Sequence, residues 1–210
     1  MANFLAGLGF GLLGYLSGSL SFALWVTKAV KGTDVRDSGS RHATTTNTIR
    51  QAGWAAGLVV FVLDIAKGFV PTYLAFAFSP VEWAAPLAGT MAVVGHCWPL
   101  FAGFRGGMGL ATFGGAILVL YPLGFAVGLG LLIALALIIR HSARASFLTG
   151  LLLAPAYWLL GQSGMVLWLA GGAGLVISIR FLSDWNRKYR ELWLDRENAA
   201  YEDSSASGGS

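Results

Sequence analysis

Long apolar runs separated by polar loops constrain the fold of this chain more than any other feature. The first run covers Phe4 to Val30, and the second covers Gly53 to Phe78. A helix needs about 20 apolar residues to cross the hydrocarbon core of a bilayer, and both runs are long enough. Only 11% of the 210 residues are charged, whereas soluble domains carry about 25%. The sequence therefore predicts an all-α integral membrane protein.

Seven spans are expected in total. The run over residues 110–139 exceeds one span and contains Pro122, which breaks a helix interior, so we predict two spans that turn at 121–124. After the first two spans, the other five are expected over residues 84–95, 110–120, 125–139, 146–160 and 166–179. The N-terminus lacks a basic segment and is interpreted as part of a retained first span. We predict one seven-span helical bundle over residues 1–194 and a disordered polar tail over 195–210.

The basic residues indicate an orientation for this bundle. All Lys and Arg residues except Lys67 lie in or beside the loops that follow spans 1, 3, 5 and 7. By the positive-inside rule these loops are cytoplasmic, which puts the N-terminus outside and the C-terminus in the cytoplasm. Lys67 and Asp64 are three residues apart within the second span and share one helix face. We interpret them as a structural ion pair that supports a polar site.

A glycine-rich stretch over residues 95–115, GHCWPLFAGFRGGMGLATFGG, is the most distinctive segment on the predicted cytoplasmic side. Glycines let a backbone approach a ligand closely. The end of the stretch at Thr112 is expected to begin a helix, whose first N–H groups favour anions. No Gly-Lys-Ser/Thr follows the glycines, so the stretch is not a Walker A loop. It is expected to bind an anion at the membrane surface, although a tight turn anchored by basic residues is the structural alternative.

The polar segment over residues 31–51 is rich in groups that bind phosphate. Ser38, Gly39 and Ser40 offer hydroxyl and backbone donors. Arg50 suits bidentate recognition of a phosphate. Asn47 lies three residues before Arg50, so the two side chains are expected to point the same way at the start of a helix.

His96 is the first candidate for general acid–base chemistry, because histidine titrates near neutral pH. The alternative is a structural histidine that donates to a loop carbonyl. His42 lies among arginines, which favour its neutral form. The single cysteine, Cys97, is interpreted as a packing residue. No cluster with metal-ligand spacing occurs and no basic stripe with interleaved aromatics suggests nucleic acid, so neither partner is expected.

Two stretches follow known sequence motifs. Residues that match GSGNxGATNxxR are Gly39, Ser40, Thr46, Asn47 and Arg50, and the LDxxKG that follows is matched by Leu63, Asp64, Lys67 and Gly68. Residues that match GHxFPxxxxFxGGKGVAT are Gly95, His96, Pro99, Phe104, Gly106, Gly107, Gly109, Ala111 and Thr112. In these motifs the chain resembles the bacterial membrane-integral acyl-phosphate:glycerol-3-phosphate acyltransferases, a family of seven-span proteins of about this length.

The resemblance implies transfer of an acyl chain from acyl phosphate to the 1-hydroxyl of glycerol 3-phosphate, giving lysophosphatidic acid for phospholipid synthesis. It implies an active face on the cytoplasmic side of the bacterial plasma membrane and no metal or other cofactor. The catalytic candidates are His96, Asn47 and Ser40. The candidates for binding substrate phosphate are Gly39, Ser40, Arg41, Thr46, Arg50, Arg105, Gly106, Gly107, Gly109 and Thr112.

The chain also departs from the family pattern. Met108 replaces the lysine of the glycine-rich motif, and a third motif, a His-Arg-Glu-Asn cluster after the last span, is absent at residues 180–183. Residues that replace glycine, asparagine, glycine and alanine in the first motif are Arg41, His42, Thr44 and Thr45. One hypothesis is that Arg41, with Arg105, restores the charge missing at Met108. Two alternative functions stay open: a catalytically silent relative that binds lipid phosphate or a membrane partner, and a small transporter that uses Asp64 and Lys67.

Overall fold

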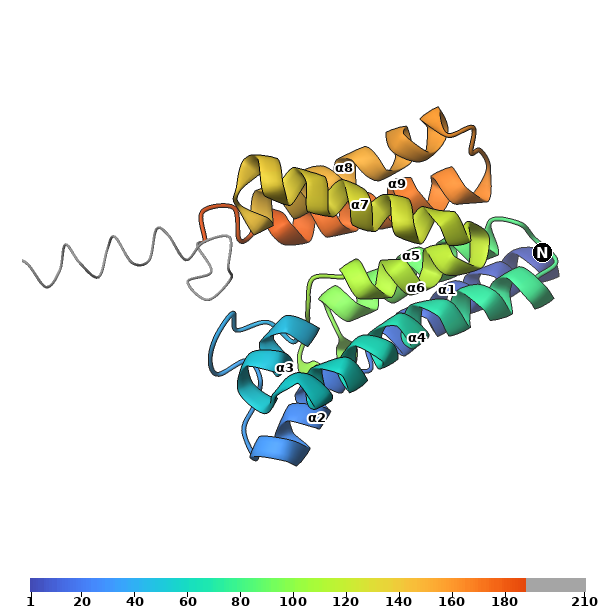
Figure 1. Cartoon of the computed structure of the whole chain (residues 1–210). Helices are drawn as coiled ribbons and strands as arrows, with labels where there is room; N and C mark the ends of the chain where they lie inside the picture. Colours follow the sequence, from blue (N-terminus) through green and yellow to red (C-terminus); the bar gives the residue numbers. More distant parts are fainter. Residues whose placement is uncertain (188–210) are drawn as a thin grey trace, which may run out of the picture.

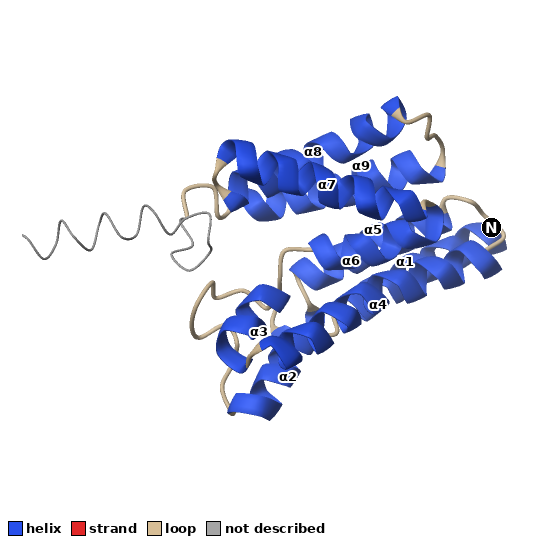
Figure 2. Cartoon of the chain, in the orientation of Figure 1, coloured by secondary structure: helices blue, strands red, loops and turns tan. Residues whose placement is uncertain are grey.

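The computed structural model describes residues 1–187, and this part of the chain contains helices and no strands (Figures 1 and 2). The elements are, in chain order, α1 (Ala2–Gly18), α2 (Phe22–Lys31), α3 (Thr45–Ala52), α4 (Trp54–Phe78), α5 (Ala84–Cys97), the 3-10 helix η1 (Leu100–Ala102), α6 (Leu110–Leu120), α7 (Pro122–Ile139), α8 (Ser142–Leu159) and α9 (Met165–Leu182). The predicted tail over 195–210, and residues 188–194 of the predicted membrane domain, lie outside the described residues.

The predicted turn between two helices in the 110–139 run is confirmed. Helix α6 ends at Leu120 and α7 begins at Pro122, so the two helices form a hairpin. Proline fits the first turn of a helix because the N–H that it lacks would have no intrahelical acceptor there. This hairpin places α7 beside α8, away from α1 (Figure 1).

The first apolar run, which was predicted as one span, does not form a single continuous helix. It breaks between α1 and α2. The Ser19 hydroxyl donates to the Tyr15 carbonyl at 2.8 Å and accepts from the Leu100 N–H at 3.2 Å. The break thus provides an acceptor for the backbone of η1, which lies 81 residues further along the chain. Helix α1 packs closely on α5, since a Cβ at Gly14 or Gly18 would collide with the α5 backbone.

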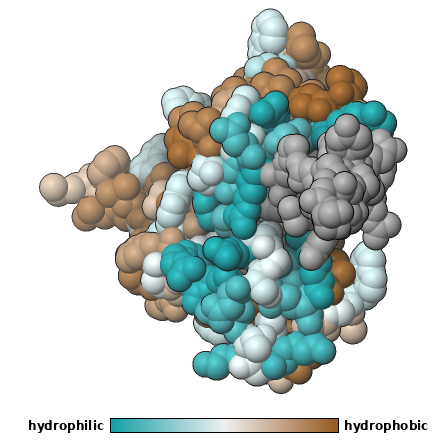
Figure 3. Space-filling model, turned by 90° about the vertical axis from the view of Figure 1, so that its left-hand side faces the viewer, coloured by the Kyte–Doolittle hydropathy of each residue, from teal (hydrophilic) through white to brown (hydrophobic). Residues whose placement is uncertain are grey.

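The polar loops gather at one end of the molecule (Figure 1). This end, here called the loop end, contains the first loop (residues 32–44), the glycine loop (residues 98–109), the α7–α8 connection and the end of α9. When the loop end is viewed directly, hydrophilic residues gather at the centre and lower part of the face, and hydrophobic residues lie at its left and upper edges (Figure 3). The N-terminus and the α4–α5, α6–α7 and α8–α9 turns lie at the opposite end (Figure 1).

Large apolar side chains cover much of the outer surface of the helices. Trp158, Trp168 and Ile138 are among the exposed ones. Five helical stretches in the described part of the chain are long and apolar enough to cross a membrane: Ala2–Lys31, Trp54–Phe78, Ala84–Ala102, Pro122–Ile139 and Met165–Leu182. Helix α6 has only 11 residues, and α8 is not among the five. The count of seven spans and the orientation of the termini therefore stay predictions.

Candidate active site

A cavity of about 420 Å³ extends from the loop end into the space between α6, α7 and α8. Its polar lining residues at the loops, α3, α4 and α5 are Ser40, His42, Thr44, Thr45, Thr46, Arg50, Asp64 and His96, and α8 adds Ser142, Ser146 and Thr149. Its apolar part is lined chiefly by Phe113, Ile117, Phe125, Leu129, Leu132 and Leu153. One end of the cavity therefore suits a charged or hydrogen-bonding group, and the other end suits a hydrocarbon chain.

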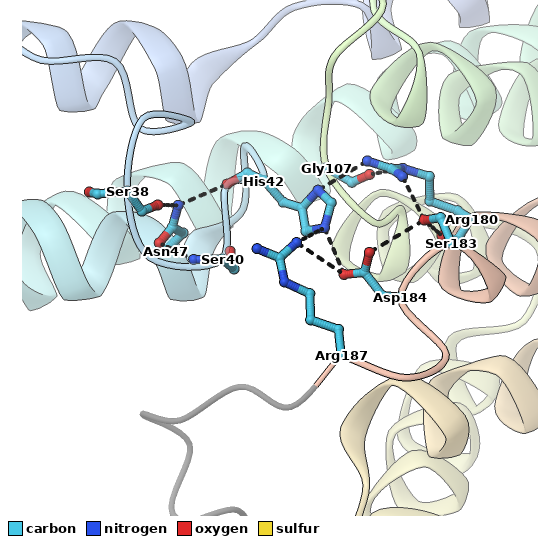
Figure 4. A network of polar contacts seen from close by, with 9 residues as sticks. All are labelled: Ser38, Ser40, His42, Asn47, Gly107, Arg180, Ser183, Asp184 and Arg187. Carbon is cyan, nitrogen blue, oxygen red and sulfur yellow. Dashed lines mark hydrogen bonds and ion pairs between the residues drawn. The ribbon is translucent and has the colours of Figure 1, made fainter. Parts of the chain in front are cut away.

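The buried amide of Asn47 holds the first loop in shape. Its Nδ2 donates to the carbonyl oxygens of Val35 at 2.6 Å, Ser38 at 3.2 Å and His42 at 3.1 Å. Its Oδ1 accepts from the Ser40 N–H at 3.2 Å. The side chain is fully buried and does not line the cavity. Figure 4 shows its bonds to Ser38 and His42, and the segment that it holds includes Ser40 and His42, which line the cavity.

The first loop is also fastened to the glycine loop. The Arg36 guanidinium donates to the carbonyl oxygens of Ala102 at 2.7 Å and Arg105 at 3.3 Å. Asp34 pairs with the same guanidinium, and the hydrogen bonds from Arg36 lower the pKa of the Asp34 carboxyl. Nearer the cavity, the Ala43 N–H of the first loop donates to the Gly106 carbonyl of the glycine loop at 3.4 Å. The two loops thus form one connected surface.

His96 lies beside the ion pair predicted in the second span. Lys67 Nζ is 2.8 Å from Asp64 Oδ1, and it also donates to the Leu20 carbonyl at 2.9 Å. His96 Nδ1 lies 3.7 Å from the same carboxylate oxygen, which is too long for a hydrogen bond. Asp64 and His96 both line the cavity, whereas Lys67 lies behind it. The predicted structural pair therefore supports the polar part of the cavity.

Several residues predicted from the sequence share this wall. They are Ser40, Thr46, Arg50, His96 and Gly109. The Ser40 hydroxyl is buried and makes no hydrogen bond within the described residues, so it is available to a ligand. Met108, which replaces the family lysine, lines the same cavity and is only 7% exposed. The aliphatic part of a lysine side chain at this position would lie in the cavity wall.

Other predicted residues lie outside this wall: Gly39, Arg41, Asn47, Arg105, Gly106, Gly107 and Thr112. Arg41 is exposed and has a φ of 58°, a left-handed conformation that favours the glycine of the family motif. Arg105 is exposed as well. The positions of these two arginines do not support the hypothesis that they restore the charge missing at Met108. Gly107 fits tightly, because a Cβ there would collide with the His96 ring and the Ala43 carbonyl.

A polar cluster that the sequence did not predict lies at the end of α9 (Figure 4). His42 Nε2 is 2.7 Å from Asp184 Oδ2, and Arg180 Nη2 is 3.1 Å from His42 Nδ1. Arg180 Nε also donates to the Gly107 carbonyl at 3.0 Å. The end of α9 thus joins the first loop and the glycine loop where the third motif was sought. Two features of the sequence could have indicated this cluster: His42 replaces an asparagine of the first motif, and the charged residues Arg180 and Asp184 stand at the end of the long apolar helix α9.

Comparisons with known proteins agree with this geometry. Residues 8–191 match the family model described as glycerol-3-phosphate acyltransferase. A glycerol-3-phosphate acyltransferase of Shouchella clausii is 43% identical over 111 residues, which cover 52% of this chain and 54% of that protein. One of Rubrobacter xylanophilus is 36% identical over 192 residues, covering 90% of this chain and 87% of that protein. The crystal structure of PlsY (YgiH), an integral membrane glycerol 3-phosphate acyltransferase, in its glycerol 3-phosphate form matches with a TM-score of 0.76 and 31% identity, covering 86% of this chain and 90% of that chain.

Proposed function

Because this chain belongs to the glycerol-3-phosphate acyltransferase family, we propose that it transfers an acyl chain from acyl phosphate to glycerol 3-phosphate, giving lysophosphatidic acid. The observation that carries the proposal is the cavity with one polar and one apolar end. An acyl phosphate has the same two parts, a phosphate and a hydrocarbon chain. The apolar end between α6, α7 and α8 would receive the chain, and the loop end would receive both phosphates.

Different groups of the cavity wall would bind the phosphate and stabilise the reacting carbonyl oxygen. Arg50 would bind phosphate through its planar guanidinium, and the unpartnered Ser40 hydroxyl would donate a further hydrogen bond. Helix α6 begins in the wall at Leu110, and the first N–H groups of a helix have no intrahelical acceptor. These N–H groups suit the negative charge that develops on the carbonyl oxygen during acyl transfer.

The reaction would proceed by attack of the glycerol 3-phosphate 1-hydroxyl oxygen on the carbonyl carbon of acyl phosphate. A new C–O ester bond forms, the C–O bond to the phosphate breaks, and inorganic phosphate leaves. His96 would take the hydroxyl proton. The Asp64 carboxylate, 3.7 Å from His96 Nδ1, would stabilise the positive charge that the ring then carries. Holding both substrates in one cavity supplies the remaining rate acceleration through proximity.

The loop end would face the cytoplasm of a bacterial plasma membrane, with residues 1–194 forming one seven-span domain. The positive-inside rule supports this orientation, because the basic loops are at that end. Both water-soluble and lipid substrates would then meet at the cytoplasmic surface. Cysteine accessibility at the two ends of the molecule in intact cells would test this arrangement.

A purified-protein assay tests the proposed activity directly. The full chain in detergent would be supplied with acyl phosphate and glycerol 3-phosphate, and lysophosphatidic acid would be measured. Arg50→Ala should lower kcat/KM about tenfold to a hundredfold, because a charge-assisted hydrogen bond contributes about 1.5–3 kcal/mol. The matched control is Arg41→Ala, which removes an exposed guanidinium outside the cavity wall and should retain most activity. Equal losses in both variants would contradict the assignment of Arg50 as the phosphate ligand.

One observation favours a second candidate function, a catalytically silent relative that binds lipid phosphate. Met108 lies in the cavity wall, at the place of the family lysine, and carries no charge. Met108→Lys separates the two candidates. Turnover by the unchanged chain supports the enzyme, whereas turnover only in Met108→Lys supports the silent relative.

A further inference from the structure

The Arg180 guanidinium is held at the loop end by three neutral acceptors (Figure 4). Nε donates to the Gly107 carbonyl at 3.0 Å, Nη1 donates to the Ser183 hydroxyl at 3.1 Å, and Nη2 lies 3.1 Å from His42 Nδ1. None of these three acceptors carries a negative charge. The Asp184 carboxylate lies one hydrogen bond further, 3.4 Å from the Ser183 hydroxyl and 2.7 Å from His42 Nε2, and it also faces a second cation, Arg187. The guanidinium is therefore fixed in place while its positive charge is not neutralised by them.

Two guanidinium groups contact the His42 ring: Arg180 Nη2 lies 3.1 Å from Nδ1, and Arg187 Nη1 lies 3.4 Å from Nε2. A guanidinium can only donate hydrogen bonds, so the shorter contact at Nδ1, together with the Asp184 carboxylate beside Nε2, favours the tautomer with its proton on Nε2. Nε2–H then donates to Asp184 Oδ2 at 2.7 Å. Asp184 is only 5% exposed, and Arg187 Nη1 lies 3.8 Å from the same carboxylate oxygen. The carboxylate therefore orients the ring that in turn holds Arg180.

The cluster borders the cavity wall at Met108: His42 lines the cavity, whereas Arg180 and Asp184 do not. Gly107, whose carbonyl binds Arg180, precedes Met108 in the chain, and both Met108 and His42 line the cavity. The family motif has a lysine at position 108, so the wall lacks an expected positive charge there. Arg180 places a positive charge beside the Gly107–Met108 segment, at the Gly107 carbonyl.

We propose that Arg180 supplies the positive charge that attracts the substrate phosphate to this wall of the cavity, acting through Gly107 and His42. It is a positioning residue, because it does not itself line the cavity. His42 and Asp184 hold it in place, which gives a role to the histidine that replaces an asparagine in the first motif. The inference rests on the proposed function for the identity of the phosphate, which belongs to acyl phosphate.

The test compares four forms of the purified full chain: the unchanged chain, Arg180→Gln, Met108→Lys, and the variant with both changes. Binding of an acyl phosphonate, an analogue that cannot transfer its acyl group, would be measured together with KM and kcat for acyl phosphate. Arg180→Gln should weaken binding and raise KM by about tenfold, with a smaller change in kcat, because a charge outside the cavity lining attracts the phosphate through space and not through a direct hydrogen bond. Adding Met108→Lys to Arg180→Gln should restore most of the loss, because it returns a charge to the same wall.

Two more variants separate charge from folding. Arg180→Lys keeps the charge but loses the fork of hydrogen bonds, so it should bind the phosphonate nearly as well as the unchanged chain. Arg144→Gln is the matched control, because Arg144 donates to the Trp185 carbonyl at 3.3 Å at the same end without lining the cavity. Its binding should be unchanged.

The outcomes are distinct. Normal binding in Arg180→Gln, a loss that Met108→Lys does not restore, or an equal loss in Arg180→Lys would each overturn the inference. Absence of phosphonate binding in all forms would overturn it too. If binding depends on Arg180 but no form turns over substrate, the inference stands and the proposed function fails. If turnover occurs without dependence on Arg180, only the inference fails.

Discussion

Replacing Asn47 by alanine is expected to open the first loop, although Asn47 does not line the cavity. Its side chain bonds four backbone groups: the carbonyl oxygens of Val35, Ser38 and His42, and the N–H of Ser40. At about 1 kcal/mol net for each hydrogen bond, the loss is at most about 4 kcal/mol. Gln51 Nε2 also donates to two of these carbonyl oxygens, at 2.7 and 3.2 Å, so the lower limit is about 2 kcal/mol.

Hydrogen–deuterium exchange of the peptide over residues 35–43 measures this opening. A loss of about 2 kcal/mol raises the open fraction, and hence the exchange rate, by about 30-fold, and a loss of about 4 kcal/mol raises it by several hundredfold. Activity should fall as well, because Ser40 and His42 would leave the cavity wall. Gln51→Ala is the control, since it leaves every bond of Asn47 in place and should change exchange only slightly.

The opposite pattern would refute this reasoning. If Asn47→Ala left exchange over residues 35–43 unchanged but abolished binding of glycerol 3-phosphate, Asn47 would be a direct substrate ligand. That is the role the motif match predicts for it. The exchange measurement therefore separates a residue that shapes the loop from one that binds the substrate.

Three further predictions concern the cavity and its support. Gly107→Ala should abolish most activity, because its Cβ would collide with the His96 ring, and the steady-state rate measures this. Gly128→Leu should fill the apolar part of the cavity and shift preference to shorter acyl phosphates, by about fourfold for each methylene no longer buried, measured as a ratio of kcat/KM values. Lys67→Met should lower the free energy of unfolding by about 3–5 kcal/mol, because it leaves the Asp64 carboxylate buried without its cation, as thermal unfolding in detergent would show.

Each of the three has a matched control. Gly171→Ala and Gly130→Leu place side chains where a Cβ meets no atom within 4 Å, so activity and chain-length preference should stay unchanged. Changing Asp64 to Asn together with Lys67→Met removes both charges and should recover part of the lost stability. Equal effects in a variant and its control would contradict the corresponding prediction.

Most of the long helices and their turns were predictable from the sequence because they depend on local properties, whereas the break between α1 and α2 was not predicted. The length of an apolar run against the thickness of a bilayer predicts a span, and Pro122 marks the α6–α7 turn without reference to any distant residue. The two motifs likewise indicated the first loop, the glycine loop and the polar residues Ser40, Arg50 and His96, which lie together in the cavity wall. Whether seven spans form, and which way they run, stays a prediction.

The tertiary structure alone decided which side chains meet. His42 and Asp184 are 142 residues apart, and nothing in either segment specifies the other as a partner. Asn47 and Arg50 are neighbours on α3, yet one bonds the first loop and the other lines the cavity, because packing around a short helix gives its faces different surroundings. The apolar part of the cavity depends on how α6, α7 and α8 pack, and the uniformly apolar sequence of α7 does not distinguish a residue that faces lipid from one that faces an acyl chain.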